Sequence, residues 1–452
     1  MNRAVTSMFD LAGAMCRTTT AAVVLLCGAV AFDPIMPGEF IAGAVAEDDK
    51  PKKDKRETRR TPALRNKVYE KLAEAQTLAE AKDYAGAGEI LNGMIAEDGK
   101  RALNSYELAN VYNLFAFLAY ATEDYPQSLR YYQQVIAQPD IPLAMEINTR
   151  FTIAQLYFVQ EQWQQGIDAM LVWFDLNEKP NAGAYVLLAQ GYYQVKRYDL
   201  ALDNVETAIS MHETEGKLPK EQWYNLARFL YFDKEDFDSA LEVLNTLIIY
   251  YPKKQYWVQA SHLYGEKKEE EKQLALMEAA YEQGFLDRSS ELVTMAYLYL
   301  NAEVPYYAGS VIEKGFEDEL VDDKSKNYEL GGSAWAQARE VEKSIPMMEK
   351  AAAKSDKGEL YVRLGNVYLD GDQFTKAADS VSKGLKKGGV KRPDQARLVL
   401  GMAYFNLGEY NKARKAFRDA GKDERSEKYA KQWIAYVTSE EERQRELEKD
   451  LF

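Results

Sequence analysis

Residues that commonly carry catalytic or metal chemistry are scarce in this chain. There are two histidines, His212 and His262, fifty positions apart, and two cysteines, Cys16 and Cys27. Neither histidine belongs to an HExxH run, whose spacing would place two imidazoles on one helical face to hold zinc. Neither has a cysteine partner. We therefore interpret both histidines as structural or solvated side chains, and we expect no metal site.

Phosphate and acid–base chemistry find no better support. The segment AGAGEI (85–90) contains Gly86 and Gly88, but it follows no strand, so it does not match a phosphate-binding loop. We interpret it as close helix packing. Aspartate and glutamate number 71 among 452 residues, so carboxylate pairs at any spacing arise by chance. The sequence favours a protein that is not an enzyme and that uses no cofactor.

Composition indicates a folded, acidic chain. Hydrophobic residues make up 46% of it, which is enough to build a core. The formal net charge of −14 disfavours nucleic acid as a partner, because phosphate binding needs a concentrated basic face. The run KPKKDKRETRR (50–60) is basic but also contains acids. We interpret residues 47–60 as a charged tether, and contact with an anionic surface is the alternative.

Residues 1–46 have the layout of a secretory signal peptide. Arg3 and Arg17 precede the apolar run AAVVLLCGAVAF (21–32), and small residues precede the charged stretch that follows. We expect cleavage after Ala46, or after Ala31 if the nearer site is used. A retained membrane anchor is disfavoured, because charged residues and prolines interrupt the run well short of the roughly 20 apolar residues that a span needs.

Both cysteines lie inside this predicted signal. The mature chain would then have no disulfide, no thiolate metal site and no cysteine nucleophile. Lipidation of Cys27 is a weak alternative, since leucine rather than a small residue precedes it.

One pattern of small and large residues recurs along the chain. In LGMAYFNLGEYNKARKAFRDA (400–420), Gly401 is followed by Tyr404, Ala413, Phe417 and Ala420. If Gly401 is numbered position 8, these residues occupy positions 11, 20, 24 and 27. The same order, complete or degenerate, begins at nine residues separated by 33 to 41 positions, apart from one double-length gap. These nine residues are Ala75, Ala116, Ala154, Ala189, Arg228, Ala296, Gly332, Gly365 and Gly401.

The spacing predicts pairs of helices. Positions 4, 7, 8 and 11 share one face of a first helix, and positions 20, 24 and 27 share one face of a second. Small residues at positions 8 and 20 let the two helices approach closely. A single pair cannot bury its apolar face alone, so neighbouring pairs must stack. We count about ten units over residues 61–420.

This pattern resembles the tetratricopeptide repeat family, whose consensus is L-G-x2-Y followed by A-x3-F. The resemblance implies an all-α fold, a right-handed superhelical α-solenoid of helix-turn-helix pairs; an unrelated helical bundle is the alternative. We expect a signal (1–46), a tether (47–60), an N-terminal sub-array (61–252), an irregular repeat with a charged insertion (253–284), a C-terminal sub-array (285–420) and a capping helix with a charged tail (421–452).

Two segments need separate expectations. The charged insertion at 267–272 is interpreted as a helical overhang, and a hinge is the alternative. In the C-terminal segment, Tyr429, Trp433 and Tyr436 share one face, so we expect a helix that covers the last repeat; an interaction helix is the alternative.

The resemblance also implies a ligand-binding groove on the concave side, lined by positions 2, 5, 9, 12 and 13 of each first helix. Amides suit an extended backbone, because they both donate and accept hydrogen bonds, and aromatic rings supply apolar anchors. The alternative for each residue is packing against a neighbouring helix. The residues at these positions are Asn110, Asn113, Phe117, Tyr120, Asn148, Phe151, Gln155, Phe158, Gln190, Tyr193, Gln222, Asn225, Phe229 and Phe232.

No unit shows the Lys and Asn pair, at positions 5 and 9, of the family's carboxylate-clamp members. Recognition of a partner's C-terminal carboxylate is therefore not expected. The resemblance implies instead a non-enzymatic scaffold that binds extended protein segments.

The whole layout, with the tail QWIAYV…RQREL, is also similar to periplasmic tetratricopeptide proteins associated with TonB–ExbB–ExbD energy transducers of Gram-negative bacteria. That similarity implies a periplasmic accessory of TonB-dependent outer-membrane transport. TonB, ExbB or ExbD would be partners, the Pro-rich linker of TonB would be a ligand, and membranes would be reached only through partners. The alternative is an assembly factor for peptidoglycan or outer-membrane machinery. An enzyme with a repeat arm is disfavoured, because the repeats leave no room for a catalytic domain.

Overall fold

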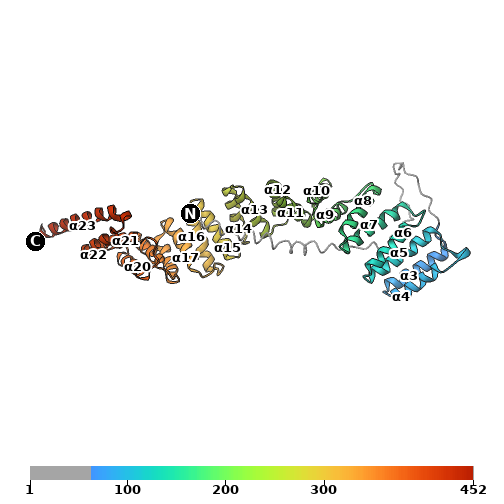
Figure 1. Cartoon of the computed structure of the whole chain (residues 1–452), viewed down its shortest axis with the longest axis horizontal. Helices are drawn as coiled ribbons and strands as arrows, with labels where there is room; N and C mark the ends of the chain where they lie inside the picture. The colour runs from blue at the N-terminus through green and yellow to red at the C-terminus, as the bar shows by residue number, and fades with distance from the viewer. Residues whose placement is uncertain (1–62, 451–452) are drawn as a thin grey trace. The chain divides into compact units, whose positions relative to one another are not determined.

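The computed structural model describes residues 63–450 (Figure 1). The predicted signal peptide and tether lie outside the described residues. Within them the chain forms 21 α-helices and one short 3-10 helix (Gly99–Arg101), with no strand, which confirms the all-α prediction. Residues up to Val243 form one compact unit, called unit 1, and residues from Leu244 form a second, called unit 2.

The helices follow one another as pairs, and we call the two members of a pair the A helix and the B helix. The A helices are α3 (Asn66–Glu80), α5 (Ser105–Ala121), α7 (Leu143–Val159), α9 (Ala182–Gln194), α11 (Glu221–Asp233), α13 (Lys254–Glu266), α15 (Ser289–Asn301), α17 (Ser325–Gln337), α19 (Glu359–Asp370) and α21 (Pro393–Asn406). The B helices are α4 (Tyr84–Ile95), α6 (Tyr125–Ile136), α8 (Trp163–Leu176), α10 (Tyr198–Thr214), α12 (Phe237–Tyr250), α14 (Glu270–Glu282), α16 (Pro305–Glu317), α18 (Val341–Ala353), α20 (Phe374–Lys387) and α22 (Tyr410–Ala420). The last helix is α23 (Glu424–Asp450). Ten pairs and a final helix agree with the predicted α-solenoid.

The two helices of a pair touch where their residues are small. Ala154 and Ala189 at position 8 are fully buried. At Gly401 an added Cβ would lie 2.5 Å from the Phe417 ring, too close for any side chain to fit without movement. Serine at position 20 serves equally well, since the Ser128 hydroxyl donates to the Ala116 carbonyl at 2.8 Å. Close approach of two backbones is therefore the common feature of the pairs.

The segment expected to be irregular, 253–284, contains a complete pair, α13 and α14. Here the serine stands in the A helix: the Ser261 hydroxyl donates to the Gln273 carbonyl at 3.0 Å. Ser261 occupies position 8 and Gln273 position 20, so neither matches the small apolar pattern. The charged run 267–272 forms the turn between the helices and the first residues of α14 rather than a helical overhang.

Every A-to-B turn has one residue in the left-handed region, at position 15. In nine of the ten described turns this residue is charged, as in Glu123 (φ 61°) and Lys196 (φ 60°), and only Gly408 (φ 72°) is a glycine. The amide of the next residue closes the helix end, as where Asp124 N donates to the Ala119 carbonyl at 2.8 Å. The Asp124 carboxylate then accepts from Gln127 N at 3.0 Å and begins the B helix.

A second recurrent contact joins consecutive pairs. Tyr at position 11 bonds to a Glu or Gln at position 25 of the preceding B helix, as where the Tyr231 hydroxyl donates to the Glu206 carboxylate. Tyr368 donates to Glu349 in the same way, and burial together with this carboxylate raises the Tyr368 pKa. In unit 1 the Gln133 amide donates to the Tyr157 hydroxyl at 3.2 Å. The phenol therefore fixes one repeat against the next.

The C-terminal helix α23 covers the last pair, which confirms the predicted cap. Its buried face contains Ala430 and Val437, and the Trp433 ring stacks on Phe417 with centroids 5.3 Å apart. Of the two predicted tyrosines, Tyr436 lies at the edge of that face: it is 54% exposed, but its ring is 5.3 Å from that of Phe405 on α21. Tyr429 is 60% exposed and is not part of the face.

A hydrogen bond to an ion-paired carboxylate ties α23 to the start of α21. Asp394 is only 2% exposed, and Arg392 donates to its two carboxylate oxygens at 3.0 and 2.6 Å. The Ser426 hydroxyl, at the start of α23, donates to the same carboxylate at 2.7 Å. The hydrogen bonds from Arg392, followed by the bond from Ser426, hold the Asp394 pKa well below its usual range. Burial acts in the opposite direction and is outweighed.

The close approach at position 8 predicts that Gly401→Ala lowers the free energy of unfolding by about 1–3 kcal/mol, because the new methyl overlaps the Phe417 ring. Urea unfolding followed by circular dichroism would measure it. Gly93→Ala is the matched control: it lies in α4, where an added Cβ meets nothing within 4 Å, so it should raise stability by about 0.5–1 kcal/mol. Equal effects of both changes would contradict this packing.

The ion pair predicts a pH-dependent effect of Asp394→Asn. A carboxyl with a depressed folded-state pKa stabilises the protein above its unfolded pKa, about 3.9, and this contribution is lost as the pH falls through the folded value. The variant should therefore lose about 1.5–3 kcal/mol at pH 7, and the difference from the native protein should shrink at acidic pH. Asp379→Asn, an exposed position on α20, is the control and should change little. Thermal melts at pH 7 and pH 3 would check this; a difference independent of pH would disprove the role of the charge.

Candidate peptide-binding surface

All fourteen predicted groove residues lie on four A helices of unit 1: α5, α7, α9 and α11. Their spacing places them on corresponding faces of the four helices. Twelve of them are half-buried; Phe158 is buried and Gln222 is exposed. The structure thus presents most of the predicted set as a partly accessible surface, which we call the amide face.

The aromatic residues at the ends of these helices support the turns. Each ring packs on the first residue of its own B helix, five positions later, with centroids 5.6 to 6.4 Å apart. The four ring pairs are Tyr120–Tyr125, Phe158–Trp163, Tyr193–Tyr198 and Phe232–Phe237. These residues are therefore structural first, and the half-buried ones leave only part of their rings available to a ligand.

Phe158 belongs to the core. Its side chain is 5% exposed, and it fills the space beside two glycines. A Cβ on Gly166 would lie 2.5 Å from the Phe158 ring, and a Cβ on Gly191 would lie 2.7 Å from it. Because this ring occupies the junction of α7, α8 and α9, we do not count it among the ligand-facing residues.

Two further aromatic residues of the predicted set each pack against another ring. The Phe151 ring lies 4.9 Å from Trp173 on α8, and Phe229 meets Tyr193 edge to face at 5.4 Å. Both remain half-buried. An apolar ligand side chain could extend these ring clusters without displacing them.

The amides divide into engaged and available groups. The Asn110 side chain donates to the Tyr106 carbonyl at 2.8 Å, and Asn225 accepts from Arg228 at 3.2 Å. Within residues 63–450, the side chains of Asn113, Gln155 and Gln190 have no hydrogen-bond partner. These three lie on α5, α7 and α9 and are half-buried. Amides that are partly desolvated and unpartnered can gain hydrogen bonds when a ligand backbone approaches.

Three of the four helices of the amide face, α5, α7 and α9, carry little free charge, whereas α11 contains Glu221, Arg228 and Asp233. Helix α9 has no charged residue, and the single one on α5, Glu107, is fully buried against Arg65, whose Nη2 lies 2.7 Å from it. On α7, Arg150 pairs with Glu146 at 2.8 Å. Burial raises the pKa of Tyr120, so its phenol stays neutral as well. In a chain of net charge −14, three helices with so little free charge favour ligands recognised by backbone and apolar groups.

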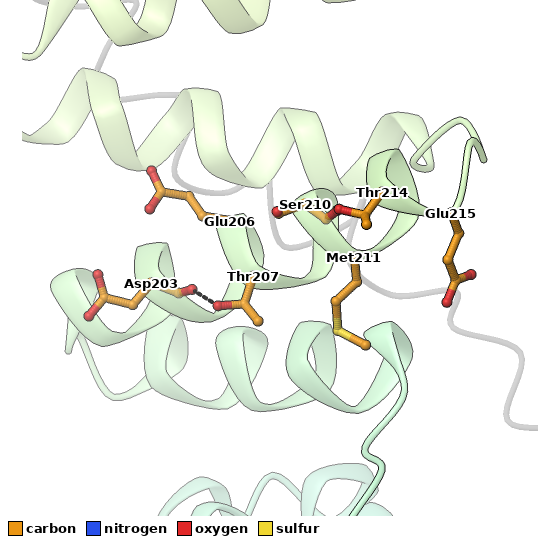
Figure 2. Close-up of a pocket in the computed structure, with 7 residues that line it drawn as sticks. All are labelled: Asp203, Glu206, Thr207, Ser210, Met211, Thr214 and Glu215. Carbon is orange, nitrogen blue, oxygen red and sulfur yellow. Dashed lines mark hydrogen bonds between the residues drawn. The ribbon is translucent and has the colours of Figure 1, made fainter.

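The hollows in unit 1 lie elsewhere, and the sequence had not pointed to them. Figure 2 shows one of about 630 Å³ along α10, a B helix, lined by Asp203, Glu206, Thr207, Ser210, Met211, Thr214 and Glu215. Another, of about 320 Å³, is lined by Ile136, Arg150, Ile153, Tyr157, Gln165, Asp168, Ala169 and Val172. Neither includes any of the fourteen predicted residues. Acids and hydroxyls at spacings of three and four on one helix are the sequence signal that would have indicated the first.

The polar groups of the α10 hollow are mostly engaged. The Thr207 hydroxyl donates to the Asp203 carbonyl at 2.7 Å, the dashed line in Figure 2. Thr214 donates to the Ser210 carbonyl at 2.8 Å. Glu206 accepts from Tyr231, and Glu215 pairs with Lys217 at 2.7 Å. The hollow is open and comes from a single helix, so it lacks the convergent polar groups of a small-molecule site.

The two histidines differ in their surroundings: His262 is exposed, and His212 packs against an aromatic ring. The His212 ring lies 4.5 Å from the Trp223 ring, and the two are tilted against each other. In the part of the chain that the structure describes, no group of three or more His, Cys, Asp or Glu side chains is arranged to hold a metal ion. Among helices at 63–450, we find none with the length and apolar character needed to cross a bilayer.

The chain was compared with known proteins once its helix pairs were established. No curated protein matches the chain. Similar solved structures include the MamA protein, with 21% identity over 39% of this chain and 94% of that one and a TM-score of 0.33. A tetratricopeptide repeat protein from Parabacteroides merdae ATCC 43184 has 16% identity over 67% of this chain and 100% of that one, with a TM-score of 0.32. The structure of Naa15/Naa10 bound to HypK-THB has 12% identity over 81% of this chain and 66% of that one, with a TM-score of 0.41.

One family model matches a segment of the chain. Residues 362–426, which include most of α19 and all of α20 to α22, match the model for the tetratricopeptide repeat. The match coincides with the segment in which the small–large pattern is most regular. Residues 362–426 are thus similar to tetratricopeptide repeats, and they make up most of the last two helix pairs before α23.

Proposed function

We propose that this chain is a non-enzymatic scaffold for protein–protein interactions, and that its amide face binds an extended polypeptide segment. The observation that carries the proposal is the row of half-buried, unpartnered amides, Asn113, Gln155 and Gln190, on three successive A helices that carry little free charge. The tetratricopeptide repeat is a protein-binding module, which supports the same conclusion at a coarser level.

The geometry suits an extended ligand. Extended backbone advances about 3.3 Å per residue, so a ligand segment of several residues can pass from one A helix to the next. Each amide could accept from one backbone N–H and donate to one carbonyl. The half-buried rings of Phe117, Tyr193 and Phe229 would contact ligand side chains between these points.

The chemistry of the amide face supports binding rather than catalysis. Its fourteen residues are asparagine, glutamine, phenylalanine and tyrosine, and none of these types titrates near neutral pH. An amide row offers no nucleophile and no general base. We therefore assign no reaction to this face.

The narrower proposal rests on the layout of the sequence. We propose that residues 1–46 direct export, that the protein works in the periplasm, and that it assists TonB-dependent transport by binding TonB, ExbB or ExbD. A Pro-rich linker is already extended and has few backbone donors, so a face that offers both donors and acceptors can pair with its carbonyls. An envelope assembly factor is the rival, and the experiments below separate the two.

The proposed binding by the amide face predicts an effect of removing the three amides. The variant Asn113→Ala, Gln155→Ala, Gln190→Ala should lose partner capture from an envelope extract, because each change removes a donor and an acceptor. We expect recovery to fall by about tenfold, equivalent to about 1.4 kcal/mol, with little change in melting temperature, since the side chains are not hydrogen-bonded within the described fold. Affinity capture of the full chain, followed by quantitative mass spectrometry, would measure it.

The matched control changes exposed polar residues of the B helices: Gln134→Ala, Gln165→Ala, Thr207→Ala. Capture should then be unchanged. If both variants bind equally well, the amide face is not the binding surface. Recovery of a TonB-type transducer or its membrane motor supports the transport proposal, whereas recovery of cell-wall enzymes or a broad client set leaves the assembly factor in its place.

Export makes its own prediction. The protein expressed with its own N-terminus in a Gram-negative host should appear in the periplasmic fraction with a shortened chain. N-terminal sequencing should find the new terminus after Ala46 or after Ala31. An unprocessed chain in the cytoplasmic fraction would reject both the signal and the transport proposal, while leaving peptide binding by the amide face intact.

A further inference from the structure

The last two repeats concentrate positive charge in an otherwise acidic chain. Residues 376–418, from α20 to α22 (orange to red in Figure 1), contain eleven lysines and arginines and three acids. Their formal net charge is +8, against −14 for the whole chain. The excess does not stand out in the sequence, because the charges are spread over three helices instead of forming a run.

Two arginines of this segment already have structural partners. Arg392 binds Asp394 through two nitrogens, and Arg414 pairs with Glu441 of α23. A guanidinium group can bind phosphate through two nitrogens at once, and in these two arginines nitrogens are already bound to carboxylates. The Arg414–Glu441 pair also shows that an acidic side chain from another helix can be seated at the edge of this segment.

The lysines are different, because they point to solvent. All seven are exposed, and we call them the lysine face: Lys376, Lys383, Lys386, Lys387, Lys391, Lys412 and Lys415. Four of them are well placed by a ring or a carbonyl, as described below. Within residues 63–450, the side chains of Lys386, Lys391 and Lys415 form no hydrogen bond or ion pair.

Tyrosines of the A helices hold several of these lysines in place. The Lys383 ammonium lies 4.4 Å from the centre of the Tyr361 ring, and the Lys376 ammonium lies 5.5 Å from that of Tyr368. One repeat later, Lys412 lies 5.3 Å from the Tyr404 ring and also pairs with Glu409. Lys376 and Lys412 both occupy position 19, so the repeat presents lysines at corresponding places on successive B helices. The rings restrain the stems and leave ammonium donors free.

The loop after α20 is fixed to the start of α19. Gly358 N donates to the Gly388 carbonyl at 2.7 Å, and Lys391 N donates to the Glu359 carboxylate at 2.8 Å. The Lys387 ammonium donates to the Ser355 carbonyl at 2.6 Å. The lysine-rich end of α20 and its loop are therefore held at a defined place instead of extending as a tail.

We propose that the lysine face binds an acidic polypeptide segment of a partner protein, as a second docking surface distinct from the amide face. Charge complementarity is the main argument, since seven exposed ammonium groups form a cationic surface that can steer and hold carboxylates. The lysines are spread over α20, the loop after it and α22, with position 19 repeated as Lys376 and Lys412, which matches carboxylates distributed along a chain better than it matches a single anion.

Two other anionic partners fit less well. A bilayer surface is normally held by inserted apolar side chains as well as by charge, yet in the described segment 376–418 Leu407 is the one large apolar side chain that counts as exposed, at 36%. Phosphate groups of a nucleic acid favour arginine forks, two of which are engaged here. Carboxylates along a polypeptide need only the point charges that the lysines offer.

The test uses the full chain and a fluorescein-labelled polyglutamate peptide, with binding followed by anisotropy. Changing Lys383, Lys386, Lys391 and Lys415 to Gln should weaken binding by about tenfold and reduce its dependence on salt. The matched control changes Lys67, Lys100, Lys179 and Lys220 of unit 1 to Gln, which are exposed and remove the same charge; it should bind within about twofold of the native chain.

Three results would overturn the proposal. Native protein that does not bind polyglutamate at low salt has no such surface. An equal loss in the control variant would show that net charge, rather than this face, determines binding. Tighter binding to phosphatidylglycerol vesicles or to polyphosphate, lost with the same four changes, would assign the face to a lipid or phosphate ligand instead. The amide variant described above should bind polyglutamate normally, which separates this surface from the proposed function.

Discussion

The architecture depends on the absence of side-chain bulk where the two helices of a pair cross. In most pairs positions 8 and 20 hold Ala, Gly or Ser, and the backbones come close enough for a serine hydroxyl to bond a carbonyl of the other helix, as Ser344 does to Gly332 at 2.7 Å. Large residues then fill the groove beside the crossing, as Phe417 does beside Gly401. Packing of this density leaves little room to adjust, so the crossing determines the direction of both helices.

Contacts between pairs are of another kind. Apolar packing between repeats is not directional, whereas the Tyr–Glu hydrogen bond has a preferred geometry and joins one tyrosine to one helix. Tyr231 with Glu206 and Tyr368 with Glu349 repeat this bond in the two units. At the C-terminal end no further repeat follows α22 within 63–450, and α23 takes over that role with Trp433 and with Ser426 bonded to Asp394. Apolar contact thus supplies stability, and the polar contacts select the neighbour and its register.

The fold was more predictable than the surface, for a physical reason. A crossing that admits only small residues leaves a mark at a fixed spacing, so nine of the pairs could be recognised without a structure. The tenth, at 253–284, was recognised only as an irregular repeat, because Ser261 and Gln273 make the contact through a hydrogen bond. Surface residues obey no such rule. Phe158 had the spacing of a groove residue, yet Gly166 and Gly191 draw its ring into the core, and no local pattern links positions 158, 166 and 191. Tyr429 likewise matched a face that the actual helix packing leaves exposed.

The two proposed surfaces rely on different forces, because charged side chains are unevenly distributed between them. The amide face in unit 1 carries little free charge on α5, α7 and α9, so binding there would come from hydrogen bonds and apolar contact, which salt screens little. The lysine face in unit 2 would rely on exposed charges, whose attraction falls as the Debye length shortens to about 8 Å at physiological ionic strength. A protein with both can bind one partner persistently and a second one conditionally. The net negative charge of the remaining chain sharpens the contrast, because it disfavours acidic segments over the rest of the molecule as a whole.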